Sequence, residues 1–155
     1  MSAEETIIAT ITESTVIAAT PAQVWAAVRD VGSVHERLLP GYVVDTRIEG
    51  DIRYLTMPSG AVIREYIVSV DDETRRLAYS AVEGFTLPID HHHASFQVFP
   101  DEAGARLVWI TDVLPHAAAA EAQLRITRGL HVMRETIEAS TLTDQPRSDR
   151  QGFLP

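Results

Sequence analysis

The chain has 155 residues, no cysteine and a formal net charge of −9 at pH 7; this length suits one domain, and the missing cysteines exclude a thiol nucleophile and a cysteine-bound metal. The acidic balance argues against a nucleic-acid partner, because nucleic-acid binders usually present a basic face. No apolar run approaches the roughly 18 residues of a membrane span, and the start MSAEETIIAT lacks the basic segment of a signal peptide, so we expect a cytoplasmic protein.

The first elements in chain order are a strand and two short helices. Residues 6–18, TIIATITESTVIA, are rich in Ile, Thr and Val, a composition typical of a strand. The segment 20–30 is predicted to form a helix, with Thr20 as its N-cap and Gln23 at the spacing of a capping box. A second helical turn is predicted within 31–41, where a Pro-Gly pair ends it.

From residue 42 the apolar residues alternate with polar ones, and short segments rich in Gly, Pro and Asp interrupt the alternation. This pattern favours an antiparallel meander over parallel βαβ units. Six strands are predicted, at 42–50, 51–57, 61–70, 75–83, 91–99 and 105–115. A long helix is predicted for 117–142, with one apolar stripe made by Ile126, Leu130, Met133 and Ile137.

This order of elements predicts an α+β fold. We expect a curved, seven-stranded antiparallel sheet wrapped round the long C-terminal helix, with the two short helices between the first and second strands. The domain would span residues 1–142, and the polar segment 143–155 would form a loose tail. Because one helix covers only part of the apolar face of such a sheet, we also expect a ligand cavity between them.

Four segments resemble the SRPBCC or START-like superfamily, whose members have the helix-grip fold of the birch pollen allergen. They are TPAQVWAAVRDVGSVHERLLPG, GDIR, IREYIVSVDDETRRLAYS and LVWITDVLP. Within the superfamily, the chain is similar to the polyketide cyclase/dehydrase and lipid transport group over about residues 6–142. Relatives include cyclases, dehydratases, lipid carriers, a co-chaperone group and the plant abscisic acid receptors, so the resemblance implies the fold and leaves the function open.

Alternation along the strands predicts which side chains enter the cavity. A three-residue turn at 58–60 would pair Leu55 with Ile63 and Arg53 with Glu65. Directly opposed residues share a face, and this face is the more apolar one, so we place it inward. The resemblance implies the same inward orientation, because the side chain at the position of Glu65 faces the ligand in the resembled receptors. The Arg53–Glu65 pair is then either a structural ion pair or a ligand contact.

The sequence also contains three consecutive histidines, His91, His92 and His93. Because side chains alternate along a strand, His92 and Phe96 are predicted to point inward, and His91 and His93 are predicted to point into solvent. The outer two would lie roughly 6.6–6.8 Å apart at Cα, but zinc needs a third ligand, so we predict no metal site. Inside an apolar cavity His92 would bond a ligand or transfer protons near neutral pH, unless a neighbour already satisfies it.

The last strand divides in the same way. Trp109 is predicted to point inward, whereas Val108, Ile110 and Asp112 point outward, which makes Asp112 a poor candidate for chemistry. An outward Val108 and Ile110 would offer a contact surface for a homodimer.

The loop 84–88, GFTLP, is predicted to flank the mouth of the cavity. In the resembled receptors the corresponding loops close over the ligand, which implies that Phe85 and Leu87 act as an apolar lid here. The alternative is an ordinary hairpin connection.

Three functions therefore remain open. The first is the binding of a hydrophobic or aromatic small molecule, lipid-, polyketide- or terpenoid-like. Its orienting contacts would come from Arg53, Glu65 and His92, and its apolar walls from Leu55, Met57, Ile63, Phe96, Trp109, Ile126, Leu130 and Met133. The second is an aromatase/cyclase- or dehydratase-like enzyme, and the third is a protein-interaction module that docks a partner on the outer sheet face.

In the enzyme, His92 and Glu65 would act as acid and base on a carbonyl substrate, and Arg53 would polarise an oxygen. Neither this function nor ligand binding requires a cofactor. The sequence has no GxSxG nucleophile motif, no phosphate loop and no dinucleotide fingerprint.

Overall fold

A computed structural model describes residues 7–84 and 87–143 of the chain. Its centre is a seven-stranded antiparallel sheet with the strand order β1-β7-β6-β5-β4-β3-β2. The strands are β1 (Ala9–Ile17), β2 (Asp45–Glu49), β3 (Ile52–Thr56), β4 (Val62–Asp71), β5 (Arg76–Glu83), β6 (His91–Asp101) and β7 (Gly104–Leu114). From β2 to β7 each strand pairs with the next in the chain, so the predicted meander is confirmed.

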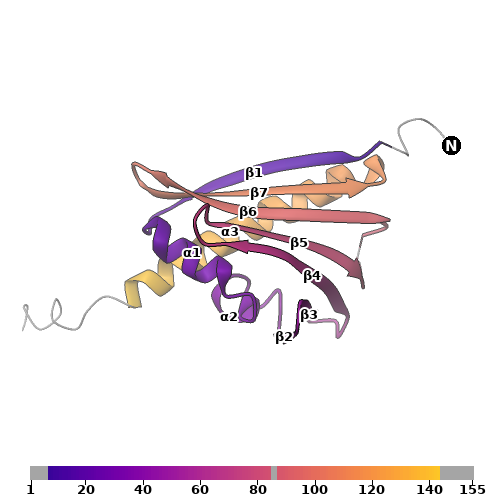
Figure 1. The fold of residues 1–155 in the computed structure, drawn as a ribbon, viewed down its shortest axis with the longest axis horizontal. Helices are drawn as coiled ribbons and strands as arrows, with labels where there is room; N and C mark the ends of the chain where they lie inside the picture. The colour runs from indigo at the N-terminus through magenta and orange to yellow at the C-terminus, as the bar shows by residue number, and fades with distance from the viewer. Residues whose placement is uncertain (1–6, 85–86, 144–155) are drawn as a thin grey trace, which may run out of the picture.

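Three helices accompany the sheet: α1 (Pro21–Arg29), α2 (Val34–Arg37) and α3 (Ala119–Thr143). In Figure 1 the long α3 passes behind the curved sheet, while α1 and α2 gather at one end of it. This arrangement confirms the predicted α+β, helix-grip architecture. The helix begins two residues later than expected, because a 3₁₀ turn, His116–Ala118, precedes it. Shifts of one or two residues at helix ends are normal.

The start of α1 follows directly from its sequence. The Thr20 side chain accepts a hydrogen bond from the Gln23 backbone N–H at 3.1 Å, and the Gln23 side chain accepts one from the Thr20 N–H at 2.9 Å. This reciprocal capping box satisfies two donors that a helix start leaves unpaired. The indole N–H of Trp25 donates to Asp72 at 2.9 Å, which ties α1 to the turn between β4 and β5.

The predicted register of the central hairpin is also confirmed. Arg53 lies opposite Glu65, and Leu55 lies opposite Ile63. The expected strand 42–50 is shorter in the structure, because β2 begins only at Asp45. Just before β2, Val43 is 3% exposed and packs in the core. The chain therefore bends inward at this point before it joins the sheet.

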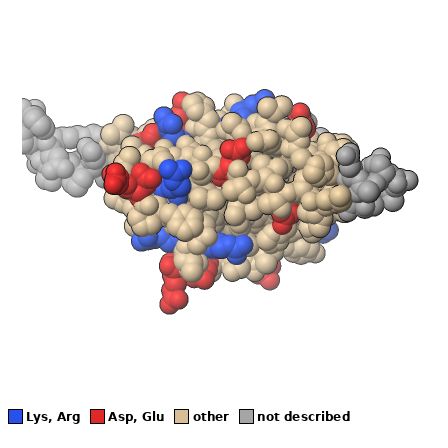
Figure 2. All heavy atoms as spheres, turned by 90° about the horizontal axis from the view of Figure 1, so that it is seen from above, with Lys and Arg blue, Asp and Glu red and all other residues tan. Residues whose placement is uncertain are grey.

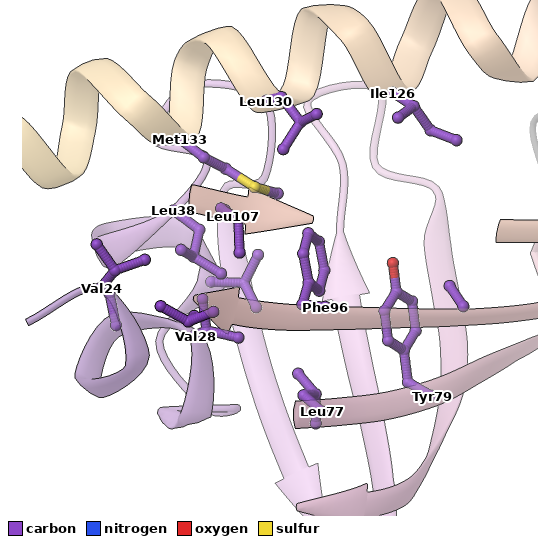
Figure 3. Packing of buried hydrophobic residues seen from close by; sticks show 14 of the residues in the cluster. Val24, Val28, Leu38, Leu77, Tyr79, Phe96, Leu107, Ile126, Leu130 and Met133 are labelled. Carbon is purple, nitrogen blue, oxygen red and sulfur yellow. The ribbon is translucent and has the colours of Figure 1, made fainter. Parts of the chain in front are cut away.

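The space between the sheet and α3 has two unlike ends. At the packed end, Ile17, Val24, Val28 and Leu107 are all 0% exposed. Figure 3 shows Val24, Val28 and Leu107 gathered beside α1, away from the labelled Tyr79 and Ile126. At the opposite, hollow end the side chains leave a cavity that Tyr79 and Ile126 both line. The packed end holds the sheet and helix together, and the hollow end forms the candidate site.

Outside the core, charged side chains are scattered. On the face in Figure 2, acidic and basic groups lie among uncharged ones, without a continuous basic surface. The absence of a nucleic-acid partner stays a prediction. None of the helices in the described part of the chain is both long and apolar enough to cross a membrane.

Candidate functional site

The candidate site is a cavity of about 470 Å³ between the sheet and α3. Strands β3 to β7 form its floor, α3 forms its roof, and residues from α2 and the segment 38–43 close one side. Pockets that hold small molecules typically measure roughly 300–1,000 Å³. The cavity is therefore large enough for an organic ligand of moderate size.

Most of the side chains that the sequence nominated surround this cavity. The nominated residues that line it are Arg53, Leu55, Met57, Ile63, Glu65, Leu87, His92, Phe96, Trp109, Ile126 and Met133. Leu130 is the exception: it is 3% exposed and packs in the core instead of lining the cavity. An apolar helix stripe indicates a buried face, but does not tell which member meets a void. Phe85 lies outside the described residues. Ligand contact by any of these side chains stays a prediction.

Arg53 and Glu65 form a buried ion pair in the wall of the cavity. Their exposed fractions are 4% and 6%, and the Arg53 Nε and Nη2 atoms lie 2.8 and 2.7 Å from Glu65 Oε1. The guanidinium also stands 5.2 Å above the centre of the Tyr79 ring. Both contacts fall on one oxygen of Glu65, and no hydrogen bond joins its Oε2 to a described residue. A carboxylate oxygen in this position can accept a further hydrogen bond.

His92 is held by the backbone of the neighbouring strand. Its Nδ1 atom accepts the Ala81 N–H at 3.0 Å, and its carbonyl oxygen accepts the Ser80 hydroxyl. The regular pairing of β5 with β6 ends at Tyr79 and Ala94, so the imidazole continues the ladder where the strands separate. Because a backbone N–H can only donate, the neutral ring must carry its proton on Nε2.

Burial is the main cause that lowers the pKa of His92 to about 4, and the neighbouring His93 and His91 add to the effect. The ring is therefore neutral at pH 7 and presents an N–H donor. A general acid or base near neutral pH works best with a pKa near the working pH. Among the roles that the sequence left open for His92, the lowered pKa favours hydrogen-bond donation over proton transfer.

Tyr79 is the central residue that sequence reasoning missed. Its hydroxyl oxygen accepts the Trp109 indole N–H at 3.1 Å, and Figure 3 shows the hydroxyl pointing towards α3. Burial, followed by the charge of Glu65, raises the pKa of Tyr79, so the group stays protonated and can donate. Alternation along 75–83 puts Tyr79 on the same face as Leu77 and Ala81, and this is the signal in the sequence that could have found it.

Trp109 connects the floor of the cavity with its roof. Its indole N–H reaches Tyr79, while its six-membered ring packs against the backbone of α3 at Gly129. A Cβ atom added at Gly129 would lie 3.0 Å from Trp109 Cζ3. A glycine at this point of the helix lets the indole stand between the layers.

The hydroxyl of Thr111 is a further polar group at the cavity. Thr111 is 3% exposed and lines the cavity, yet its hydroxyl makes no hydrogen bond within the described ranges 7–84 and 87–143. A buried hydroxyl without a partner destabilises the folded state. Parity placed Thr111 inward, but only the structure reveals that it is unsatisfied.

The cavity reaches solvent between α3 and the segment before β2. Among the residues that line it, Tyr42 is 47% exposed, and Glu121 and Arg128 are exposed as well. Arg125, also in the lining, lies 3.4 Å from Glu121 across one helical turn. The opening is therefore framed by charged side chains, whereas the interior is mostly apolar.

The outer histidines lie on the opposite side of the sheet. His91 and His93 pair with Leu114 and Asp112 of β7. Within the described part of the chain, no group of three or more His, Cys, Asp or Glu residues is arranged to hold a metal ion.

Comparisons with known proteins agree with this architecture. A family model described as "Polyketide cyclase / dehydrase and lipid transport" matches residues 9–138. Norcoclaurine synthase from Thalictrum flavum, solved with dopamine and hydroxybenzaldehyde, is 22% identical with a TM-score of 0.71, covering 92% of this chain and 91% of its own. Protein XoxI from Bacillus cereus is 21% identical with a TM-score of 0.68, covering 87% and 95%. A search of curated proteins finds no match.

Proposed function

The chain belongs to the polyketide cyclase / dehydrase and lipid transport family, and we propose that it binds a hydrophobic or aromatic small molecule in its cavity. The observation that carries this proposal is the cavity of about 470 Å³, with apolar walls and a few polar groups directed inward. Such a composition fits a site that obtains affinity from apolar burial and orientation from a small number of hydrogen bonds. The ligand would be lipid-, polyketide- or terpenoid-like.

The cavity also affects the packing of the interior. The side chains around it lack the packing contacts that a filled core supplies. A ligand restores those contacts without a rearrangement of the fold. At the hollow end, both Tyr79 and Ile126 line the cavity and are at most 5% exposed, so an occupant beside them would be sheltered from water although the cavity opens elsewhere.

The test uses the uncharged fluorescent probe N-phenyl-1-naphthylamine together with native mass spectrometry of freshly purified protein. We expect a carried ligand in the mass spectrum, or probe binding with enhanced fluorescence if the protein is empty. Ala122→Leu places a larger side chain inside the cavity, since Ala122 lines it and is 4% exposed. This variant should weaken the probe at least tenfold.

The matched control is Ala139→Leu, the same substitution at an exposed position of α3 that does not line the cavity. Its probe affinity should equal that of the wild type. A bare mass combined with no probe binding to the wild-type protein would refute the proposal.

A catalytic use of the same cavity is the second candidate, and the unbonded Glu65 Oε2 atom favours it. The sequence contains no lysine, so a lysine Schiff base is excluded. The remaining mechanism is acid–base chemistry on a carbonyl substrate, in which Glu65 accepts a proton while Arg53 and His92 donate hydrogen bonds to the oxygen. Glu65→Gln and His92→Ala should then abolish turnover of a panel of poly-β-keto substrates; unchanged rates in both variants would eliminate the mechanism.

The proposal also includes a cytoplasmic location, one ligand-binding domain over residues 1–142 and a homodimer formed through the outer sheet face. Ile110 on that face is 38% exposed and Phe99 is 41% exposed. Light scattering gives the molar mass of the wild type and of Ile110→Lys and so tests the dimer. A charged side chain in the proposed interface should leave only monomer. A wild-type protein that is monomeric at all concentrations would contradict this part.

A further inference from the structure

Three polar side chains project into the cavity from neighbouring strands. Tyr79 on β5 lies opposite Ala94 on β6, and Ala94 lies opposite Thr111 on β7. His92 stands two residues before Ala94, and therefore on the same face of β6. All three polar side chains line the cavity. They thus surround the small side chain of Ala94, and the rings of Tyr79 and His92 are centred 5.7 Å apart.

Two of these groups can present only a donor to a ligand. The Tyr79 oxygen already accepts the Trp109 indole N–H, so its own proton is left for another acceptor. The Nδ1 atom of His92 already accepts the Ala81 N–H, which leaves the Nε2–H free to donate. The Tyr79 oxygen and the His92 Nδ1 atom each accept from an N–H group, and such a group can only donate.

Thr111 supplies an independent observation, a polar group that a ligand could bond. Its hydroxyl is buried beside the cavity and lacks a hydrogen-bond partner in the described part of the chain. Nearly all buried hydroxyls in folded proteins are bonded, and an exception calls for an explanation. An oxygen atom on the cavity ligand would accept this proton.

A flat aromatic surface lies next to the three donors. The Tyr79 and Phe96 rings are stacked, with their centres 5.9 Å apart and an interplanar angle of 14°, and Phe96 lies 4.5 Å from Trp109. Such a surface favours another flat ring, because aromatic groups gain from offset stacking beyond simple burial. Phe96 and Tyr79 stand side by side below α3 in Figure 3.

We propose that Tyr79, His92 and Thr111 form a donor-rich site that holds the carbonyl oxygen of a flat aromatic ligand. The inference rests on the proposed binding function and adds to it the ligand class, an aryl carbonyl compound. A carbonyl oxygen at this point can accept from all three groups, whereas a ligand ammonium or amide N–H would find an acceptor among them only in the Thr111 hydroxyl. The oxygen would be fixed by the polar side chains, and the ring system would lie against Phe96.

The test compares 9-fluorenone with fluorene, which have the same tricyclic shape and differ by C=O against CH₂. Isothermal titration calorimetry should show about tenfold tighter binding of fluorenone to the wild-type protein, the gain expected from one or two satisfied hydrogen bonds. The direction is informative, because fluorene is the more hydrophobic compound and would bind more tightly in a purely apolar cavity.

Thr111→Val removes the hydroxyl and keeps the shape of the side chain. We expect a three- to tenfold loss of fluorenone affinity with fluorene affinity unchanged, and a higher melting temperature of the empty protein. Tyr79→Phe should also narrow the difference between the two compounds. Thr136→Val is the matched control: the Thr136 hydroxyl bonds the Val132 carbonyl within α3 and does not line the cavity, so both affinities should stay at their wild-type values.

The outcomes separate this inference from the proposal beneath it. If both compounds bind equally, or if Thr111→Val and Tyr79→Phe leave the preference intact, the donor site is refuted while ligand binding stands. If neither compound binds the wild-type protein, the donor site is refuted. The N-phenyl-1-naphthylamine experiment then tests separately whether the protein binds any ligand in its cavity.

Discussion

The packed end and the hollow end are covered by the same sheet and the same helix, but they use different chemistry. At the packed end, Val24, Val28 and Leu107 are apolar and completely buried. At the hollow end, Tyr79, His92 and Thr111 bring polar atoms into the interior beside a cavity. The packed end favours stability, because its apolar side chains fill the interior. The hollow end contains a cavity and, among the described residues, a buried hydroxyl without a hydrogen-bond partner. The difference indicates that the packed end stabilises the fold, whereas the hollow end supplies the cavity of the proposed binding site.

The largest effect is expected from breaking the buried ion pair at the hollow end. Arg53→Met should lower the free energy of unfolding by about 3–5 kcal/mol, because it leaves the Glu65 carboxylate buried without its partner. The double variant Arg53→Met/Glu65→Leu should recover most of this loss, since an apolar pair of similar size needs no charge compensation. Urea denaturation measures both. A double variant as unstable as the single one would show that the pair itself stabilises the fold.

At the packed end, truncation should affect stability without affecting binding. Leu107→Ala is expected to cost about 2–5 kcal/mol of unfolding free energy, as deletions in well-packed cores do. Its affinity for N-phenyl-1-naphthylamine should remain at the wild-type value. Ile126→Ala, in the roof of the cavity, should show the reverse: a smaller loss of stability and a clear change in probe affinity. Equal effects of both variants on binding would contradict the division into two ends.

The pH dependence of stability sharpens the comparison at His92. Its pKa in the folded protein is about 4, below the ordinary value of 6.5, so the unfolded chain binds more protons between these two pH values. Stability is therefore complete above pH 6.5 and falls as the pH decreases towards 4. The contribution of His92 to this loss should be about 3 kcal/mol by pH 4.

His92→Gln isolates this contribution, because glutamine keeps an acceptor for the Ala81 N–H but does not titrate. The neighbouring His91, His93 and Asp112 are present in both proteins, so the two proteins differ only at position 92. We expect the unfolding free energy of the variant, measured by urea denaturation from pH 7.5 to 4.5, to fall less steeply than that of the wild type. Parallel curves would mean that His92 is not neutral in the folded state.

The smallest effect on stability is expected where helix and cavity meet. Gly129→Ala gains up to about 1 kcal/mol of helix propensity, but the new methyl group approaches Trp109 closely. Since Trp109 borders open space, the indole can shift into the cavity. Unfolding free energy should therefore change by less than about 1 kcal/mol, while probe affinity falls several-fold. An unchanged affinity would show that the position of Trp109 is unimportant for the ligand.

Parity and turn length were sufficient for much of the site. The three-residue turn at 58–60 and the period of two placed Arg53 opposite Glu65 and sent His92 and Trp109 inward. These features depend on local geometry, because side chains alternate along any strand and a short turn leaves one register. Leu130 shows the limit of the method, since periodicity identifies a buried face of α3 but not the part of it that borders a void.

The sequence by itself determined the order of the elements, the curved sheet round one helix, and the face on which each side chain lies. The tertiary structure decided the chemical roles of those side chains. The bond from Trp109 to Tyr79 joins residues 30 positions apart, and the imidazole of His92 takes its tautomer from a backbone group on the adjacent strand. Whether a side chain donates or accepts a hydrogen bond depends on the groups that it contacts on other strands and layers. The alternation of side chains within one strand does not predict these contacts.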